Sequence, residues 1–293
     1  MEVVDVTVRP PWPSEPPRSS GPGGLVRIDG GVARRALRIG DELALVEAAW
    51  RDDDVRLRAQ AETEDAAHAA LGRMRFVLAL DDDLEPFHRA HRNDPLLGRM
   101  LKARPKLRPL RKPEPFEALA WAIIEQLIDT QRAGDIAWTL TRRHGTRHAE
   151  GPWSAPLPDA LANAARLEAA GLAPTQSRTL SRVARAVAAG QIDPEDDDQR
   201  KLDAIPGVGE WTLAHLDLFG RGRYDVALGG DVGMRNCYAR VAGVRTGSVK
   251  EAEFAAVLDR YKPFQGLAAM YLVAAGWRSG GRWSQSPDAL RRR

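Results

Sequence analysis

The sequence predicts a mostly α-helical protein that begins with a small α+β domain. Short alternating apolar stretches, separated by turn residues, occupy the first 61 positions, as is typical of an antiparallel sheet. From Leu84 onward, apolar residues recur at helical spacing in nearly every segment. These two observations predict a helical bundle joined to a small antiparallel sheet.

Four stretches carry strand patterns: Val3–Val8, Gly24–Ile28, Ala36–Glu47 and Val55–Ala61. The segment 10–24 is rich in Pro, Ser and Gly and is expected to be a loop. A helix is expected over Thr63–Leu80, because its apolar residues share one face: Ala67, Leu71, Met74 and Leu78. One sheet with a covering helix follows from this order.

The rest of the chain is expected to form helices over Leu84–Asn93, Pro95–Ala103, Phe116–His144, Leu157–Ala170, Gln176–Ala189, Pro194–Ile205, Glu210–Phe219, Asp231–Ala242, Ser248–Arg260 and Gly266–Ala275. The longest of these is expected to break near Asp129. The expected domains are 1–90 (α+β), 91–112 (a helix and a basic, Pro-rich connector), 113–230 (helical, with a tight hairpin) and 231–293 (C-terminal helices).

Composition excludes several classes of protein. The single cysteine, Cys237, leaves no internal disulfide, no Cys-rich zinc site and no cysteine-ligated iron–sulfur cluster. No run of 18 apolar residues is present, so no membrane contact is expected. The acidic start, Met1–Asp5, lacks the basic and apolar pattern of a signal peptide, so a cytoplasmic protein is expected.

Basic residues cluster in one segment although the net charge is only +3. Lys102–Lys112 contains six basic residues and no acid. Such a segment indicates a polyanionic partner, and a solvated linker explains it equally well.

The motif Ile205-Pro206-Gly207-Val208-Gly209 joins two expected helices through a very short turn. Glycine permits positive φ and close approach of another backbone. Successive amides in such a turn form an anion nest, and the N-terminus of the next helix points to the same place. The motif is therefore a candidate phosphate site, with an ordinary corner between two helices as the alternative.

Asp231 follows Gly229-Gly230, 22 residues after Gly209. Asp is a preferred N-cap, so capping of the next helix explains this residue without any further role. Capping is compatible with catalysis, because a helix N-terminus favours the carboxylate form. A permanent carboxylate can stabilise a developing cation.

Together, the hairpin and the acid that follows it resemble the helix-hairpin-helix DNA glycosylase superfamily, specifically the bacterial 3-methyladenine DNA glycosylase II (AlkA-type) family. The resemblance covers nearly the whole chain. It is carried by Leu78–Asp83, Pro115–Leu119, Ala122–Gln126, Gly171-Leu172, Ser177-Arg178, the hairpin and Gly230–Arg235. It implies a helix-hairpin-helix bundle with a small antiparallel-sheet domain, in which the C-terminal helices complete an active-site cleft.

The resemblance also implies a reaction: hydrolysis of the N-glycosidic bond of an alkylated purine, of the 3-methyladenine type, in base-excision DNA repair. The base would be flipped out of the duplex. Asp231 is the candidate that stabilises the oxocarbenium-like sugar and that orients or deprotonates the attacking water. Relatives that also cleave the DNA strand use a lysine just after the hairpin. Trp211 stands at that position here, which predicts a monofunctional enzyme.

DNA contacts follow from the same resemblance. Phosphate binding is expected at Gly207, Val208, Gly209 and Thr212. Gln126 and Leu127 match the residues that wedge into the duplex when the base leaves it. A core position on an amphipathic helix explains Leu127 equally well.

The base pocket is expected at Trp211, His215 and Leu272, where the flipped base would stack. His215 stands where the family pattern has a Tyr, and Leu272 stands where it has a Trp, so the expected pocket is less aromatic. A buried, hydrogen-bonded position in the helix is the other interpretation of His215.

The expected partner is double-stranded DNA that contains damaged bases, bound by a monomer that is associated with the nucleoid in the cytoplasm. No cofactor or metal ion is expected, apart from a monovalent cation at the hairpin carbonyls when DNA is bound. Two alternatives stay open: a non-catalytic helix-hairpin-helix DNA-binding protein, and a glycosylase for a different damaged base.

Overall fold

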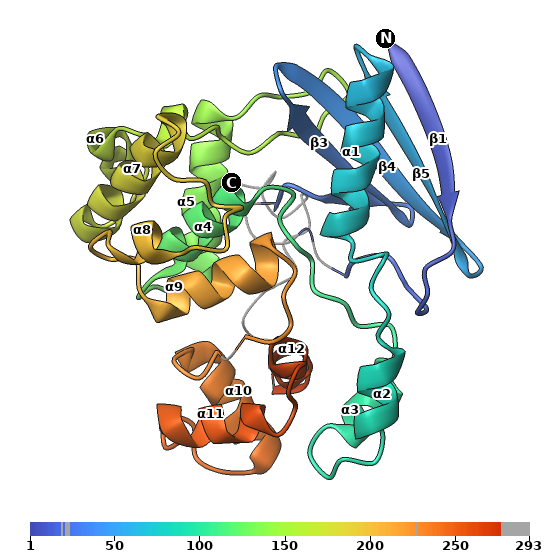
Figure 1. Cartoon of the computed structure of the whole chain (residues 1–293), viewed down its shortest axis with the longest axis vertical. Helices are drawn as coiled ribbons and strands as arrows, with labels where there is room; N and C mark the ends of the chain where they lie inside the picture. Colours follow the sequence, from blue (N-terminus) through green and yellow to red (C-terminus); the bar gives the residue numbers. More distant parts are fainter. Residues whose placement is uncertain (19, 21–23, 227, 277–293) are drawn as a thin grey trace.

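The computed structural model describes residues 1–18, 20, 24–226 and 228–276 of the chain (Figure 1). A sheet with one helix forms one part of the molecule, and helices form the rest. The expected fold class, mostly α with a small antiparallel α+β domain, is confirmed. Within the described residues, no helix is both long and apolar enough to cross a membrane.

In the described part of the chain, five antiparallel strands form one sheet in the order β1-β5-β4-β3-β2. They are β1 (Glu2–Val8), β2 (Arg27–Asp29), β3 (Val32–Ile39), β4 (Glu42–Arg51) and β5 (Asp54–Ala61). The expectation of a single strand over Ala36–Glu47 is wrong. Gly40 takes a φ of 56°, and the chain reverses so that Ile39 pairs with Glu42 in a tight hairpin.

Helix α1 (Glu64–Val77) packs on one face of this sheet. Thr63 caps it, because its hydroxyl accepts a hydrogen bond from the Ala66 amide at 3.3 Å. The expected apolar face is confirmed, since these residues are all buried against the strands: Ala67, Leu71, Met74 and Leu78. The helix ends slightly before the expected Leu80, where Ala79 takes a φ of 51°.

Two charged side chains of the basic connector (within residues 91–112) are buried inside the molecule. It follows α2 (Glu85–His91) and α3 (Gly98–Ala103). Arg111 is buried and donates to Asp82 at 2.6 Å, and the buried Lys112 ammonium lies 3.7 Å from Glu117. For these two residues both expectations, a polyanion site and a solvated linker, are wrong, because carboxylates inside the protein neutralise their charge.

The next helices form the body of the helical part: α4 (Pro115–Glu125), α5 (Thr130–His144), η2 (Asp159–Leu161), α6 (Ala164–Ala169), α7 (Pro174–Ala188), α8 (Arg200–Asp203), α9 (Glu210–His215) and η3 (Leu216–Gly220). The expected break near Asp129 is confirmed, since Asp129 caps α5 by accepting from the Arg132 amide at 3.0 Å. The helix expected over Pro194–Ile205 contracts to α8. The carboxylates of Asp193 and Asp196 instead accept hydrogen bonds from the backbone amides two residues further on, and these hydrogen bonds form turns.

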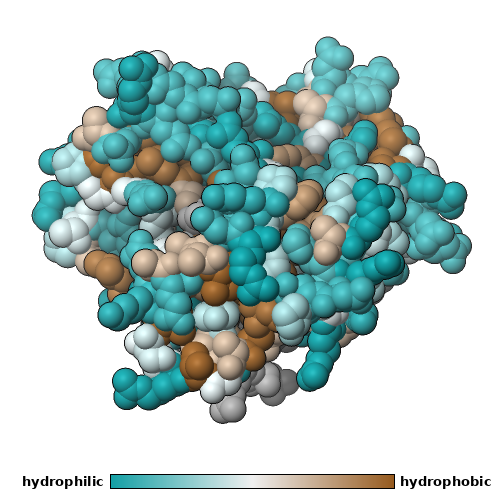
Figure 2. Space-filling model, turned by 60° about the horizontal axis from the view of Figure 1, so that its bottom comes forward, coloured by the Kyte–Doolittle hydropathy of each residue, from teal (hydrophilic) through white to brown (hydrophobic). Residues whose placement is uncertain are grey.

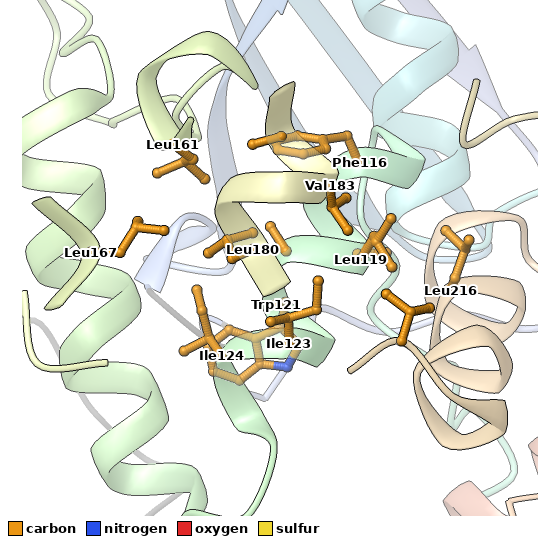
Figure 3. Close-up of a cluster of buried hydrophobic side chains, with 14 of the residues drawn as sticks. Phe116, Leu119, Trp121, Ile123, Ile124, Leu161, Leu167, Leu180, Val183 and Leu216 are labelled. Atoms are coloured by element: carbon orange, nitrogen blue, oxygen red, sulfur yellow. The ribbon is translucent and has the colours of Figure 1, made fainter. Parts of the chain in front are cut away.

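The core of this part lies around α4 and α7 (Figure 3). Leu119 and Ile123 of α4 pack with Leu180 and Val183 of α7, and Trp121 lies in the same cluster. This packing holds the C-terminal end of α4 close to α7 and α9, and the candidate site residues Gln126, Trp211 and His215 lie on or directly beside these elements.

Helices α10 (Val232–Ala242), α11 (Glu251–Asp259) and α12 (Gln265–Gly276) complete the described chain. They share one apolar core with α2 and α3, which includes Phe87, Leu101 and Tyr271. The expected domain boundaries stay a prediction, and residues 277–293 of the last domain lie outside the described residues. Figure 2 turns this end of the molecule forward. Its surface is mainly hydrophilic, with hydrophobic residues in separate patches.

Candidate active site

The expected hairpin joins α8 to α9 and is held against α7. Thr179 of α7 donates its hydroxyl to the carbonyl of Pro206 at 3.0 Å. Gly207 takes a φ of 93°, and a Cβ atom at this position would lie 2.2 Å from Thr179 Oγ1. Glycine is therefore required at Gly207 for two reasons, the backbone conformation and the close approach of α7.

Some amides of the hairpin have no hydrogen-bond partner among the described residues, and others are used internally. Gly207 and Gly209 are exposed, and within the described residues their amides have no hydrogen-bond partner. Val208 differs, because its side chain is buried and its amide donates to the Ile205 carbonyl at 2.9 Å. The Thr212 side chain is buried as well. Of the four expected phosphate contacts, only the two glycines are open to a ligand along the hairpin.

Gln126 connects the hairpin to the end of α4. Its side-chain amide donates to the Gly207 carbonyl at 2.8 Å and to Thr212 Oγ1 at 2.9 Å. Gln176 of α7, itself buried, donates to the Gln126 carbonyl at 2.6 Å. Sequence reasoning missed Gln176 and Thr179. The feature of the sequence that could have indicated them is a pair of polar side chains three residues apart on the buried face of an amphipathic helix.

Leu127 follows directly, in the short link between α4 and α5. It takes a φ of 60°, a left-handed conformation that costs roughly 1–2 kcal/mol for a residue with a Cβ atom. Its side chain is fully exposed, at 102%. The interpretation of Leu127 as a core leucine is therefore wrong. A strained backbone that presents an apolar side chain to water indicates a contact with a partner.

Asp231 is an N-cap and also belongs to a largely buried polar cluster. Its Oδ1 accepts from the Met234 amide at 2.8 Å, which caps α10. Its Oδ2 accepts from the indole N–H of Trp211 at 2.9 Å. One oxygen thus serves the helix and the other faces α9, so capping leaves room for a second role.

His215 lies one turn after Trp211, and its ring packs on the indole with 4.0 Å between the ring centres. Its Nδ1 is 2.9 Å from the Trp211 carbonyl oxygen, and its Nε2 is 3.5 Å from Asp231 Oδ2. Burial lowers the pKa of His215, although the Asp231 carboxylate acts in the opposite direction. The fold therefore brings Trp211 and His215 together beside Asp231.

Glu125 is a further carboxyl group in this region that sequence reasoning did not single out. It ends α4 and accepts a hydrogen bond from the Thr130 hydroxyl at 3.1 Å. Burial raises the pKa of Glu125 to about 7, and repulsion from Asp231 adds to the effect. Its signal in the sequence was an acid at the end of an otherwise apolar helix, directly before Gln126.

Comparison with curated proteins finds relatives that cover part of the chain, whereas no family model matches it. The chain is 27% identical over 191 residues to DNA-3-methyladenine glycosylase 2 of Escherichia coli (strain K12), covering 62% of this chain and 65% of that protein. It is 27% identical over 149 residues to DNA-3-methyladenine glycosylase of Bacillus subtilis (strain 168), covering 47% and 49%. The chain spans about half to two thirds of the length of these relatives.

Solved structures extend the likeness to almost the entire fold. A 3-methyladenine DNA-glycosylase from Archaeoglobus fulgidus gives a TM-score of 0.77 at 18% identity, covering 92% of this chain and 98% of that one. The apo-form of the Clostridium acetobutylicum 8-oxoguanine glycosylase/lyase gives 0.71 at 17% identity, covering 94% and 98%. The sequence relatives and this shared fold confirm the resemblance to the helix-hairpin-helix DNA glycosylases. Both sequence relatives are named as 3-methyladenine glycosylases, which confirms the AlkA-type resemblance.

In this fold the expected pocket residue Leu272 does not line an open pocket. It is completely buried in the core of the C-terminal helices. The neighbouring Tyr271 is buried too and donates its hydroxyl to the Arg104 carbonyl at 3.0 Å, so it does not replace the missing aromatic residue. An apolar cavity lies between Leu25 and Trp121, and Asp231 is not among the residues that line it.

Proposed function

We propose that this protein is a DNA glycosylase that hydrolyses the N-glycosidic bond of alkylated purines, of the 3-methyladenine type, in base-excision repair. The observation that carries the proposal is the Asp231 carboxylate, which Met234 and Trp211 hold in place beside the hairpin. The names of the two sequence relatives support this substrate class. The partner is double-stranded DNA that contains a damaged base.

The hairpin would hold the DNA through its backbone. Gly207 and Gly209 are exposed and their amides have no partner among the described residues, so these amides suit a phosphate oxygen, and such a contact does not depend on the base sequence. Leu127, in its strained and exposed position, suits the gap that a flipped base leaves in the stack. Gln126 supports this wedge from behind by its hydrogen bonds to the hairpin.

The chemistry would depend on charge. An alkylated purine already carries a positive charge, so it leaves readily with the electron pair of the glycosidic bond. The sugar then approaches an oxocarbenium ion, which a fixed carboxylate stabilises. Asp231 suits this role, because the N–H groups of Trp211 and the α10 backbone orient its oxygens before the substrate arrives.

We infer a monofunctional enzyme that leaves an abasic site. A strand-cleaving glycosylase uses an amine that forms a Schiff base with the sugar. Trp211 stands where such an amine would follow the hairpin, and the sequence has no lysine between Lys201 and Lys250. A monomer in the cytoplasm, associated with the nucleoid, and a monovalent cation at the hairpin carbonyls in the DNA complex complete the proposal.

The test is release of methylated purines from alkylated duplex DNA by the wild type and by Asp231→Asn. Asn is also a good N-cap, so the variant keeps α10 and removes only the charge. We expect the variant to release bases at least about 100-fold more slowly. DNA binding without base release by either protein would instead support the alternative of a non-catalytic DNA-binding protein. Release of only a different damaged base would support the alternative of a glycosylase for that base. Strand cleavage that borohydride traps would refute the monofunctional assignment.

A further inference from the structure

His215 has a geometry that stacking against a base does not require. The Trp211 carbonyl can only accept a hydrogen bond, so Nδ1 of His215, 2.9 Å away, carries the ring hydrogen. In a neutral imidazole the other nitrogen, Nε2, is then a bare acceptor. Burial favours this neutral form, because it lowers the pKa of His215.

Nε2 nevertheless faces another acceptor. It lies 3.5 Å from Oδ2 of Asp231, and both side chains are largely buried. Two acceptors cannot hydrogen-bond to one another, but a single water molecule can donate to both of them. Because Oδ1 caps α10 through the Met234 amide, the water would lie on the side of Asp231 that faces α9.

We propose that His215 and Asp231 together hold the attacking water of the proposed glycosylase reaction, and that His215 Nε2 accepts its proton. The proposal rests on the proposed function. As the C1′–N bond breaks, its electron pair leaves with the alkylated purine, which becomes neutral. The water oxygen forms a bond to C1′, and one water proton passes to Nε2. Asp231 stays ionised and stabilises the sugar cation.

The surroundings hold both partners of this pair in place. Trp211 packs against the His215 ring, and its indole N–H donates to Asp231 Oδ2 at 2.9 Å. Phe219 lies 5.7 Å from the imidazole, measured between ring centres. Trp211 thus orients both the His215 imidazole and the Asp231 carboxylate. Oδ2 already accepts a hydrogen bond from the indole, whereas Nε2 has no hydrogen and no other donor among the described residues, so the imidazole receives the proton.

Other titratable groups reach the pair from α4 and α10. Glu125 at the end of α4 and the Cys237 thiol on α10 both interact electrostatically with Asp231. Glu125 titrates with a pKa of about 7, whereas the pKa of His215 lies below its ordinary value of 6.5. The variant Glu125→Gln removes the first titration and leaves the second, so it identifies which group causes a change in rate.

The test is the pH profile of single-turnover methylpurine release from duplex DNA. We expect the wild-type rate to fall toward acid pH, with a midpoint below 6.5, as His215 becomes protonated. His215→Asn is expected to be about 100-fold slower and to lose this acid limb, with substrate affinity unchanged within about twofold. The matched control, His68→Asn on the exposed surface of α1, is expected to behave as the wild type.

If the Asn variant does not fold, His215→Tyr is the second variant, because a tyrosine ring is closer in bulk to histidine than asparagine is. This variant should also lose the fall in rate at acid pH. Nitrogen NMR of His215 adds a measurement that is independent of activity. We expect a neutral ring at pH 7 with its hydrogen on Nδ1. An imidazolium at pH 7, or an acid limb that persists in both variants, overturns the proposal. A wild type that releases no methylpurine, or a fully active Asp231→Asn, defeats the proposed function instead, and the NMR result then still decides the state of His215.

Discussion

Replacement of Leu127 by asparagine is expected to make the protein more stable and less active. Leu127 takes a φ of 60°, in the left-handed region, where its Cβ atom costs roughly 1–2 kcal/mol. Asparagine tolerates this conformation far better, because its short polar side chain hydrogen-bonds locally. The leucine side chain is 102% exposed, so its removal loses no apolar burial in the free protein. The variant should therefore unfold with a free energy about 1 kcal/mol higher.

The same substitution should weaken function if Leu127 enters the duplex. Burial of a leucine side chain contributes about 1.5–3 kcal/mol, which corresponds to roughly a 10- to 150-fold change in affinity. Urea denaturation gives the stability, and fluorescence anisotropy with a duplex that carries an abasic site gives the affinity. The control is Leu157→Asn, which removes an exposed leucine of 44% accessibility far along the chain and should leave DNA affinity unchanged.

The two expectations for Leu127→Asn, on function and on stability, can be refuted independently of each other. DNA affinity and base release equal to the wild type would refute the wedge, whatever the stability. A free energy of unfolding lower than that of the wild type by more than about 0.5 kcal/mol would refute the strain argument, because the new side chain loses no contact in the free protein.

Two further substitutions probe residues of the site, and one probes the buried ion pair of the connector. In urea denaturation, Glu125→Gln should stabilise the protein by about 3 kcal/mol above pH 7 and should have no effect below pH 4.5. The reason is that the folded wild type holds the Glu125 proton more tightly than the unfolded chain, so the wild type loses stability as the pH rises from 4.5 to about 7. A stability difference that does not vary with pH would contradict this. Gly207→Ala should cost at least about 2 kcal/mol, more than the control Gly190→Ala, which shares a positive φ but has nothing within 4 Å; equal losses would show that α7 yields. Asp82→Asn should cost about 3–5 kcal/mol in thermal unfolding, because it leaves the Arg111 guanidinium buried without its charge partner, and a loss below about 1 kcal/mol would mean that the pair contributes little.

Local patterns in the sequence predicted the fold well because they depend on neighbouring residues. The apolar face of α1 and the break at Asp129 follow from periodicity and capping, and both are confirmed. The strand expected over Ala36–Glu47 is wrong because its turn, at Gly40, interrupts an apolar stretch for only two residues. Strand patterns continue on both sides of such a turn, so the pattern alone does not reveal the reversal.

Features that depend on distant residues could not be predicted in this way. The buried position of Arg111 requires Asp82, 29 residues earlier, and composition alone gives no sign of this pairing. Leu127 continues an apolar helical pattern, yet α4 ends before it. The reason lies on α7, where Gln176 donates to the carbonyls of Gln126 and Ile124. These hydrogen bonds hold the end of α4, and the chain leaves it through the left-handed Leu127.

The supports of the wedge and of the acid meet on consecutive residues of α9. Thr212 accepts from Gln126, next to Leu127, and Trp211 donates to Asp231. The apolar side chain proposed to enter the duplex and the carboxylate proposed to act on the sugar are therefore connected through one peptide unit of α9. In the proposed reaction, binding energy gained by Leu127 at a distance from the glycosidic bond then fixes the sugar against Asp231, which is how remote contacts increase the rate rather than only the affinity.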